Sequence, residues 1–336
     1  MTTLSAIVPA TDSPPTLDLA LAAIRSAADA PEELIVVRDG GSRGAAAARN
    51  LGARGASGDV LVFVDADVVV APDAFTRMRR AFDRDRGLGA LFGSYDADPP
   101  RAGLVSDFRN LLHHHVHQSD PGEAATFWTG LGAVRRELFE EAGGFDHERY
   151  CGAEIEDIEL GTRLVDLGAR IVLDPGVQGK HLKRTTLPRM LWTDVFLRGV
   201  PWTALLLERR SAPTALNLSW SNRLSAGASM GGAAALLLRR PRSVAVAGLA
   251  LVALNHRFYA LMWRRSGPVG AAGSVGLHAL HHLAGIAALP LGVHRYLTGR
   301  PSVQLAPAPR PSADHAVEPE PAVDGDAGAR DVRGVV

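Results

Sequence analysis

Two carboxylates follow an apolar run in the N-terminal third of the chain. Residues 60–64 are valine, leucine and phenylalanine only, which is typical of a strand buried on both faces, and Asp65 and Asp67 come directly after them. At this spacing two side chains share one face of a strand. Close carboxylates repel each other unless a cation bridges them, and Mg²⁺ or Mn²⁺ prefers such oxygen ligands together with phosphate. The pair predicts a divalent metal site, although aspartates are also common in a plain turn.

Two other polar segments have spacings that suit a nucleotide. A strand-like run at 34–37 ends in Arg38, Asp39 and two glycines, whose backbone groups and carboxylate could hold a base or ribose. The same letters are typical of an ordinary turn. Arg49 lies in a helical stretch before the metal-site strand, where a guanidinium could reach a diphosphate. The alternative for Arg49 is a surface arginine.

A third acidic segment opens a predicted helix. Leu160, Leu164 and Leu167 follow helical spacing, so Glu156 and Asp157 fall in the first turn. A helix N-terminus favours an ionised carboxylate, and an ionised carboxylate facing a pocket is a suitable general base for an alcohol. Acidic residues are also frequent at helix N-termini for stability alone.

The elements that must position these residues alternate along the chain. Short runs rich in valine, isoleucine and leucine indicate strands, and longer stretches between them indicate helices. The strand runs are 6–8, 34–37, 60–64, 89–92 and 170–173, and the helical stretches are 17–28, 45–53 and 72–82. Such alternation predicts an α/β fold with a mostly parallel, Rossmann-like sheet, in which functional groups gather at the carboxyl ends of the strands.

Composition bounds the class and compartment of the protein. The 336 residues carry 36 basic and 36 acidic side chains, and this zero net charge argues against a nucleic-acid partner. Cys151 is the only cysteine, so a disulfide framework within the chain is excluded and a reducing compartment is favoured. The N-terminus shows no basic region followed by an apolar run, so we expect no signal peptide and a cytoplasmic catalytic domain.

The C-terminal part of the sequence suggests a membrane. We expect a catalytic domain at 1–186, amphipathic interface helices rich in tryptophan and arginine at 187–223, and membrane-associated or transmembrane helices at 224–297. Of three apolar stretches, only 267–293 clearly reaches the length of a spanning helix. Those at 224–238 and 243–254 would span if shifted or tilted, or form a shallow hairpin, and a buried helical subdomain is the soluble alternative. Residues 298–336 have the composition of a disordered tail.

Taken in chain order, the polar segments resemble the family 2 inverting glycosyltransferases of the GT-A fold. The match covers about the first 190 residues, and the ordered set is far more specific than any one member. It runs through Ala6-Ile7-Val8-Pro9, Asp39-Gly40-Gly41-Ser42, Ala48-Arg49-Asn50, Asp65-Ala66-Asp67, Gly143-Gly144-Phe145-Asp146 and Glu156-Asp157.

This resemblance implies roles for the donor-binding and metal-binding residues. Pro9 and Ala10 would line the nucleotide site, and Asp39 would recognise the base. Asp65 and Asp67 would be the Asp-x-Asp pair, with Asp67 the more direct ligand of Mn²⁺ or Mg²⁺.

The resemblance also implies which residues act on the acceptor. Asp157, beside Glu156, matches the catalytic base. Trp128 and Gly130 belong to a segment that resembles the floor of the acceptor and donor-sugar site.

Two residues near the end of the matched region complete the expected site. A histidine at this place often completes the metal site in GT-A enzymes, so we expect the same of His181, for which a surface position in a basic loop is the alternative. Lys183 would steady the leaving diphosphate. An arginine, Arg38, stands where the family usually has an acidic residue, which bears on base recognition.

The predicted activity follows from the resemblance and from one missing motif. The Gln-x-x-Arg-Trp motif of processive synthases is absent, so transfer of one sugar is favoured over polymerisation. We expect inverting transfer from a nucleotide-diphosphate sugar to a hydroxyl of a lipid-linked or cell-envelope acceptor, at the cell membrane. Another nucleotide enzyme, such as a nucleotidyltransferase, and an inactive membrane-attached binding protein are the alternatives.

Overall fold

The structure, a computed structural model, divides into two compact units. It describes residues 1–12, 14–38, 44–100, 102–152, 154–211, 216–299 and 330–332. Among these, the sheet unit consists of Met1–Ser94, Gly122–Leu182 and the segment 330–332, and the helical unit consists of Tyr95–Pro121 and residues 183–299.

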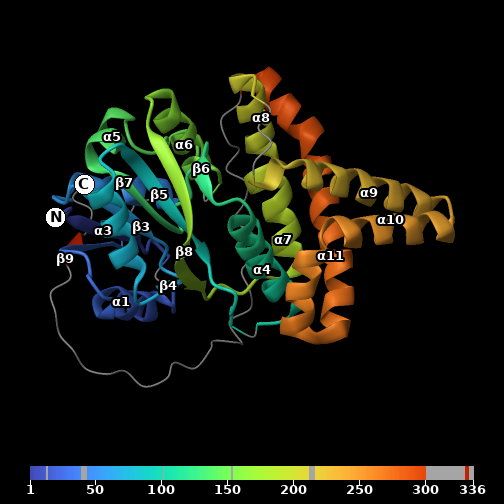
Figure 1. Cartoon of the computed structure of the whole chain (residues 1–336). Helices are drawn as coiled ribbons and strands as arrows, with labels where there is room; N and C mark the ends of the chain where they lie inside the picture. Colours follow the sequence, from blue (N-terminus) through green and yellow to red (C-terminus); the bar gives the residue numbers. More distant parts are fainter. Residues whose placement is uncertain are drawn as a thin grey trace. The chain divides into compact units, whose positions relative to one another are not determined.

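A nine-stranded sheet forms the centre of the sheet unit (Figure 1). Its order is β4-β8-β5-β7-β3-β1-β2-β9, and β6 pairs with β8. The bounds are β1 Leu4–Pro9, β2 Glu33–Val37, β3 Val60–Val64, β4 Val68–Val70, β5 Leu88–Tyr95, β6 Gly122–Ala124, β7 Leu131–Arg135, β8 Arg170–His181 and β9 Arg330–Val332.

Most of the central strands run in one direction. β1 is parallel to β2 and β3, and β7 is antiparallel to both β3 and β5, so β1, β2, β3 and β5 share a direction. Every residue of β1 and β3 is buried, because helices pack on the sheet. These helices are α1 Leu17–Ser26, α2 Gly44–Arg54, α3 Ala74–Arg84, α5 Arg136–Glu141 and α6 Glu156–Asp166. The expected α/β class is confirmed, with β7 as an antiparallel strand inside the sheet.

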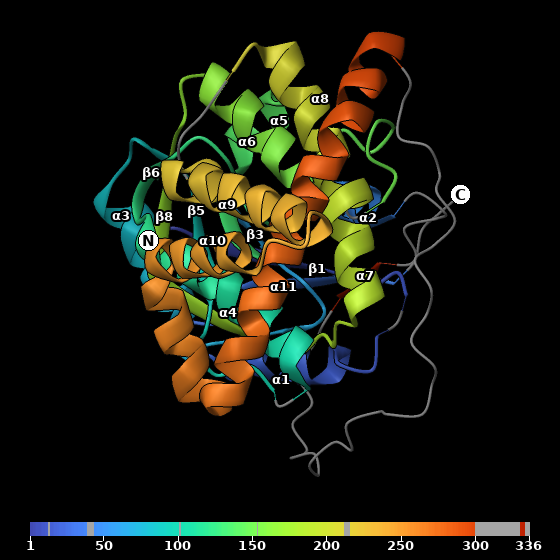
Figure 2. The same cartoon turned by 90° about the vertical axis from the view of Figure 1, so that its right-hand side faces the viewer.

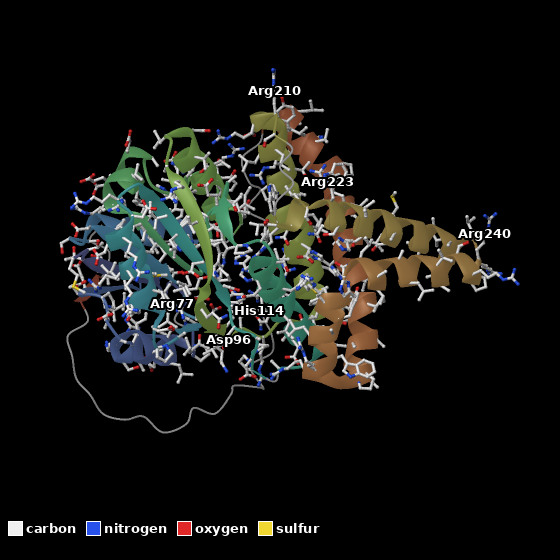
Figure 3. All side chains as sticks on the ribbon, viewed as in Figure 1. Arg77, Asp96, His114, Arg210, Arg223 and Arg240 are labelled. Carbon is white, nitrogen blue, oxygen red and sulfur yellow. The ribbon has the colours of Figure 1, made fainter. Side chains whose placement is uncertain are left out.

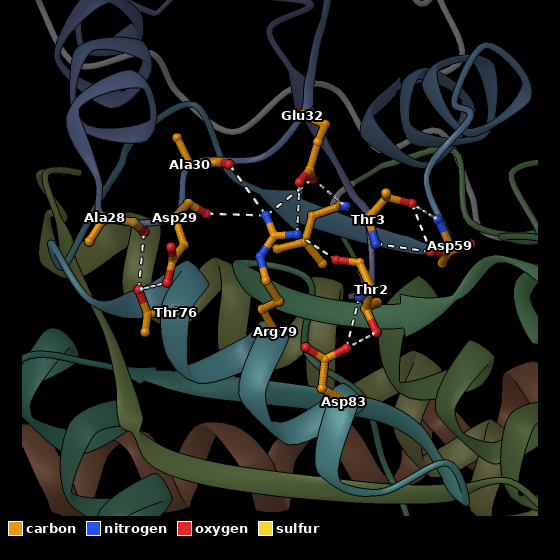
Figure 4. A network of polar contacts seen from close by, with 11 residues as sticks. Thr2, Thr3, Ala28, Asp29, Ala30, Glu32, Asp59, Thr76, Arg79 and Asp83 are labelled. Atoms are coloured by element: carbon orange, nitrogen blue, oxygen red, sulfur yellow. Dashed lines mark hydrogen bonds and ion pairs between the residues drawn. The ribbon is translucent and has the colours of Figure 1, made fainter.

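A polar network ties the amino ends of the strands together (Figure 4). The side chain of Arg79 in α3 is buried; it donates to the carbonyl of Thr2 and forms an ion pair of 2.8 Å with Glu32. The carboxylate of Asp59 accepts from the backbone and hydroxyl of Thr3. The network lies at the edge opposite to the carboxyl ends of β1 and β3, and it fixes the start of β1.

The helical unit is built around α4 Leu104–Ser119 and α11 His256–Thr298. Phe108, Met190, Phe258 and Met262 form its buried core. The remaining helices are α7 Leu187–Trp192, the π-helix η2 Thr193–Gly199, α8 Val200–Arg209, the short 3₁₀ turn η3 Leu216–Leu218, α9 Trp220–Leu237 and α10 Pro241–Leu254. Near its start α11 is kinked at Gly267, whose φ of 69° is followed by a proline.

A buried carboxylate links three helices of this unit. Asp194 in η2 lies 2.7 Å from Nη1 of Arg109 in α4 and 2.7 Å from Nδ1 of His281 in α11. Burial raises the pKa of Asp194, but the opposing effect of Arg109 and His281 is larger. Together they lower the pKa of Asp194 to about 2. The three side chains therefore form one charge bridge inside the unit.

Three helices, α9, α10 and α11, occupy the region where membrane-associated segments are expected. Among the described residues, His256–Thr298 is the helix that is long and apolar enough to cross a membrane, and it contains the stretch expected at 267–293. α9 and α10 pack along each other as a hairpin (Figures 1 and 2). Most of the expected tail at 298–336 lies outside the described residues, which include only its first two residues and β9 there.

Candidate functional site

Arg49 lies at the centre of the candidate site. Its Nη2 lies 2.7 Å from Oδ1 of Asp65 at the end of β3, and its Nη1 lies 2.9 Å from Oε1 of Glu156 at the start of α6. The residue is only 4% exposed, so the surface alternative for Arg49 does not hold. Burial alone would lower its pKa, yet Asp65 and Glu156 raise the pKa of the guanidinium above its usual value. Arg49 is therefore a charged bridge between two of the expected site segments.

The neighbouring residue, Asn50, fixes a third segment. Its side-chain Nδ2 donates to the carbonyl of Phe145 at 2.8 Å, and its Oδ1 accepts from the backbone N–H of the same residue at 2.9 Å. Two neighbouring residues of α2 thus hold two different segments. Asn50 holds the Gly143-Gly144-Phe145-Asp146 segment, and Arg49 contacts Asp65 at the end of β3. Asn50 belongs to the Ala48-Arg49-Asn50 motif, but the sequence alone suggests no role for it.

Asp67 and His181 meet through strand pairing. β4 is antiparallel to β8, with Val68 opposite His181, and the N–H of Leu182 donates to the carbonyl of Asp67 at 2.8 Å. This register places Nε2 of His181 3.6 Å from Oδ2 of Asp67. His181 is thus on a strand beside Asp67, although the two are far apart in sequence.

Asp157 is held at the N-terminal end of α6. Its Oδ1 accepts from the N–H of Ile158 at 2.8 Å, and its Oδ2 accepts from the N–H of Thr129 at 3.3 Å and from the hydroxyl of Thr129 at 3.5 Å. The carboxylate is partly exposed, whereas that of Glu156 is buried against Arg49. Of the two acidic residues, Asp157 is the one whose environment leaves it accessible.

The segment Trp128–Gly130 lies between the two acidic ends. The carbonyl of Gly130 accepts from the N–H of Asp65 at 3.2 Å, while Thr129 contacts Asp157. The ring of Trp128 folds over Gly130 so closely that an added Cβ would lie 2.2 Å from a ring carbon. A side chain at position 130 would therefore displace the Trp128 ring, and the role of Thr129 is a further feature that the sequence does not reveal.

The remaining predicted residues fall in three different places. Pro9 and Ala10 are buried at the carboxyl end of β1, where the N–H of Ala10 donates to the carbonyl of Val37 at 2.8 Å. Asp39 lies outside the described residues. Lys183 is the first residue of the helical unit after β8, so its distance from the sheet-unit site is not described.

The electrostatics of the site are dominated by carboxylates. Asp65, Asp67, Glu156 and Asp157 lie on the carboxyl-end side of the sheet, and Arg49 contacts two of them. Among the side chains that the structure describes, no three of His, Cys, Asp or Glu form a group that could hold a metal ion. The expected trio is divided: Asp67 and His181 face each other, whereas Asp65 pairs with Arg49.

The comparison with known families decides the class of this domain. The sequence model described as Glycosyl transferase family 2 matches residues 7–143, which include β1, α2, β3 and both aspartates after it. The N-terminal part of the chain is a family 2 glycosyltransferase domain. The expected GT-A fold class is confirmed by this match together with the sheet. Asp157 in α6 and His181 in β8 lie beyond the matched residues but within the same sheet unit.

Three solved structures are distantly similar to this chain. The mannosyltransferase PcManGT from Pyrobaculum calidifontis in complex with GDP-Man and Mn²⁺ is 20% identical, with a TM-score of 0.49 over 89% of this chain and 88% of that chain. S. aureus TarS is 15% identical, with a TM-score of 0.44 over 89% and 92%. GalNAc-T7 with UDP, GalNAc and Mn²⁺ is 15% identical, with a TM-score of 0.43 over 57% and 46%. These likenesses are too distant to carry residue roles to this chain. A comparison with curated protein sequences found no match.

Proposed function

We propose that this protein transfers one sugar from a nucleotide-diphosphate sugar to a hydroxyl group, with inversion, on a lipid-linked or cell-envelope acceptor. The observation that carries the proposal is the bridge formed by Thr129 and Gly130: Thr129 contacts the carboxylate of Asp157, and the carbonyl of Gly130 accepts from the backbone N–H of Asp65. These two neighbouring residues hold the donor-side Asp65 and the accessible acceptor-side Asp157 near each other. Fixed geometry between reactants is a main source of rate acceleration in group transfer.

Asp157 is the proposed general base. The start of α6 and the N–H of Thr129 stabilise its negative charge, and the partly exposed carboxylate is open to an acceptor hydroxyl. In the proposed reaction Asp157 takes the proton of that hydroxyl as its oxygen bonds to the anomeric carbon. The bond from that carbon to the diphosphate breaks on the opposite side, so the configuration inverts.

Asp67 and His181 are the proposed metal ligands. A carboxylate oxygen and an imidazole nitrogen 3.6 Å apart suit Mn²⁺, and Mg²⁺ and Mn²⁺ sites commonly need only one or two protein ligands when phosphate supplies the rest. The residues present therefore fit such an ion. When bound, the ion would neutralise charge on the leaving diphosphate.

The roles proposed for the other donor-site residues are those expected from the sequence, with one revision. Pro9, Ala10, Asp39, Trp128, Gly130 and Lys183 remain the proposed nucleotide-sugar residues. Arg49 and Glu156 are instead proposed as positioning residues, because each is buried in an ion pair with the other. Asp65 is held by Arg49 and would face the donor from that fixed position.

Membrane attachment is proposed for the helical unit. α11 supplies the length and apolar composition of a spanning helix, and the sheet unit would remain on the cytoplasmic side. An acceptor held in the bilayer would then reach the transferase domain without leaving the membrane.

Replacement of Asp157 tests the proposed base. Asp157→Asn should lower kcat by at least about a hundredfold, because general-base catalysis contributes about 10² to 10⁴ in rate, while donor binding is kept. Transfer would be followed with UDP-, GDP- and dTDP-sugars, and donor binding by thermal shift. Asp166→Asn, an exposed change at the other end of α6, is the matched control. Normal turnover by Asp157→Asn would refute the assignment.

Replacement of Asp67 tests the proposed metal ligands. In wild type, Mn²⁺ should raise the melting temperature only when a matching donor is present, because diphosphate completes the site. Asp67→Ala should abolish this Mn²⁺-dependent shift, and His181→Ala should weaken it. An unchanged shift in Asp67→Ala would place the ion elsewhere.

A further inference from the structure

The hairpin of α9 and α10 is apolar over almost its whole outer surface. Neither limb, 224–238 or 243–254, contains a charged residue. Near its turn, Leu237 is 85% exposed and Leu249 is 70% exposed, and Met230, Leu236 and Val246 are exposed with them. Removing such side chains from water is favourable. A surface of this kind in contact with water would be strongly unfavourable.

The contact between the two helices is made by small residues. Ser229 and Ala235 are the buried positions in the outer half of α9, and an added Cβ on Gly232 would lie 3.1 Å from Cβ of Ala247 in α10. A helix pair in water buries its large apolar side chains and exposes its small or charged ones. The hairpin has the reverse arrangement, which is typical of helices packed within lipid.

Arginines mark both ends of this apolar surface. Arg239, Arg240 and Arg242 lie at the turn, where Figure 3 shows Arg240 at the tip, and Arg223 stacks over the ring of Trp220 at the other end, 5.1 Å from its centroid. The sequence contains no aspartate or glutamate between positions 209 and 313. The complementary partner for the tip is therefore an anion from outside this part of the chain, and guanidinium groups bind phosphate well.

The hairpin is somewhat shorter than the hydrocarbon core of a bilayer is thick. The 18 residues of α9 and the 14 of α10 correspond to about 27 Å and about 21 Å of helix, against a hydrocarbon core of about 30 Å. Leu236, Leu237 and Leu238 point in three directions, because successive residues of a helix are about 100° apart. A protein groove or a second copy of the chain would cover one face, whereas lipid covers all of them.

We infer that the α9–α10 hairpin is immersed in the acyl chains of a bilayer containing anionic phospholipid, with the tip arginines bound to headgroup phosphates. The inference deepens the proposed membrane attachment and rests on it, and it assigns a contact to lipid beyond α11. It does not depend on the sugar chemistry of the sheet unit.

A fluorescent label at the hairpin tests the immersion. Cys151 is the only cysteine, so Cys151→Ser gives a background in which Leu237→Cys or Val246→Cys carries a single dye sensitive to its surroundings. The full-length protein is reconstituted into vesicles of phosphatidylcholine and phosphatidylglycerol. We expect a blue-shifted emission and strong quenching by lipids with nitroxide-labelled acyl chains. The matched control, a dye at Glu137→Cys on an exposed face of α5, should show neither effect.

The outcomes separate lipid from the other occupants. Water-like emission at both hairpin positions in protein that floats with the vesicles would overturn the inference. A blue shift without quenching by the lipid nitroxides would mean that protein covers the hairpin, and this too would overturn it.

The tip arginines are tested by lipid composition. Phosphatidylglycerol should speed insertion of the labelled hairpin relative to pure phosphatidylcholine vesicles, and R239Q/R240Q/R242Q should abolish this difference. An equal rate in both vesicles for the unmodified tip would contradict the phosphate contact. Donor hydrolysis or transfer in detergent, measured on the same labelled proteins, reports separately on the transferase, so loss of one function is distinguished from loss of the other.

Discussion

The two units each bury one charge bridge, and the bridges have opposite composition. In the sheet unit, one guanidinium, that of Arg49, is shared by the carboxylates of Asp65 and Glu156. In the helical unit, one carboxylate, that of Asp194, is shared by Arg109 and His281. Both bridges join elements that are distant in sequence, so both set the arrangement of a unit.

The difference between the bridges shows which of them suits a binding site. Two carboxylates on one cation leave excess negative charge at the carboxyl end of β3, where we propose that a metal ion binds beside Asp67. In the Asp194 bridge the one carboxylate is balanced by the guanidinium of Arg109. An excess of buried charge is unfavourable for folding unless a ligand of opposite charge compensates it. The sheet-unit bridge, with its excess negative charge, is therefore the one that suits a bound cation.

The largest expected effect comes from removing Arg49. Arg49→Met should lower the free energy of unfolding of the sheet unit by about 3–5 kcal/mol, because two carboxylates would remain close together with no buried cation. Hydrogen exchange at the amides of α2 and β3 measures this locally. Arg49→Lys keeps the charge but not the fork to both partners, so it should recover part of the stability and little of the transfer rate. Full stability in Arg49→Met would break the comparison.

A smaller effect is expected from Asp194. Asp194→Asn should lower the stability of the helical unit by up to about 3 kcal/mol, because the buried guanidinium of Arg109 would lose its carboxylate partner. In wild type burial raises the pKa of Asp194, yet Arg109 and His281 lower it to about 2 from the ordinary 3.8. Its contribution, about 2 kcal/mol, is therefore present above about pH 4 and lost as the pH falls through 2. Unfolding curves against pH should lose this acid dependence in Asp194→Asn. If Asp194→Asn keeps the acid dependence of its stability, another group is responsible for that dependence.

The smallest effect serves as the reference for both bridges. Arg77, labelled in Figure 3, forms an ion pair of 2.6 Å with Asp73 at the start of α3, and both side chains are about half exposed. Arg77→Ala should change the free energy of unfolding by less than about 0.5 kcal/mol, because solvent screens such pairs. Denaturant unfolding measures it, and a loss comparable to that of Arg49→Met would mean that burial does not explain the difference.

The sequence predicts the strands well where their composition is distinctive. The run at 60–64 coincides with β3, and the run at 34–37 lies within β2. The short strand β7 was not predicted, because Leu131–Arg135 contains a glycine and an alanine and has the same composition as a loop. Its antiparallel direction depends on pairing with β3 and β5, which no local pattern encodes.

The candidate site shows the same limit. Local patterns predict Asp65, Asp67 and Asp157, because each follows a strand or begins a helix. The role of Arg49 depends on partners 16 and 107 residues away, so spacing alone suggested a diphosphate ligand where the structure shows an ion-pair bridge. The functional roles of all these residues stay predictions until the variants above are measured.

The end of β8 lies close along the chain to the boundary between the two units. His181 is its last residue, and the helical unit begins two residues later at Lys183. Consecutive Cα atoms are about 3.8 Å apart, so Lys183 can lie no more than about 7.6 Å from His181 along the chain. A single residue, Leu182, therefore lies between the imidazole beside Asp67 and the first residue of the helical unit.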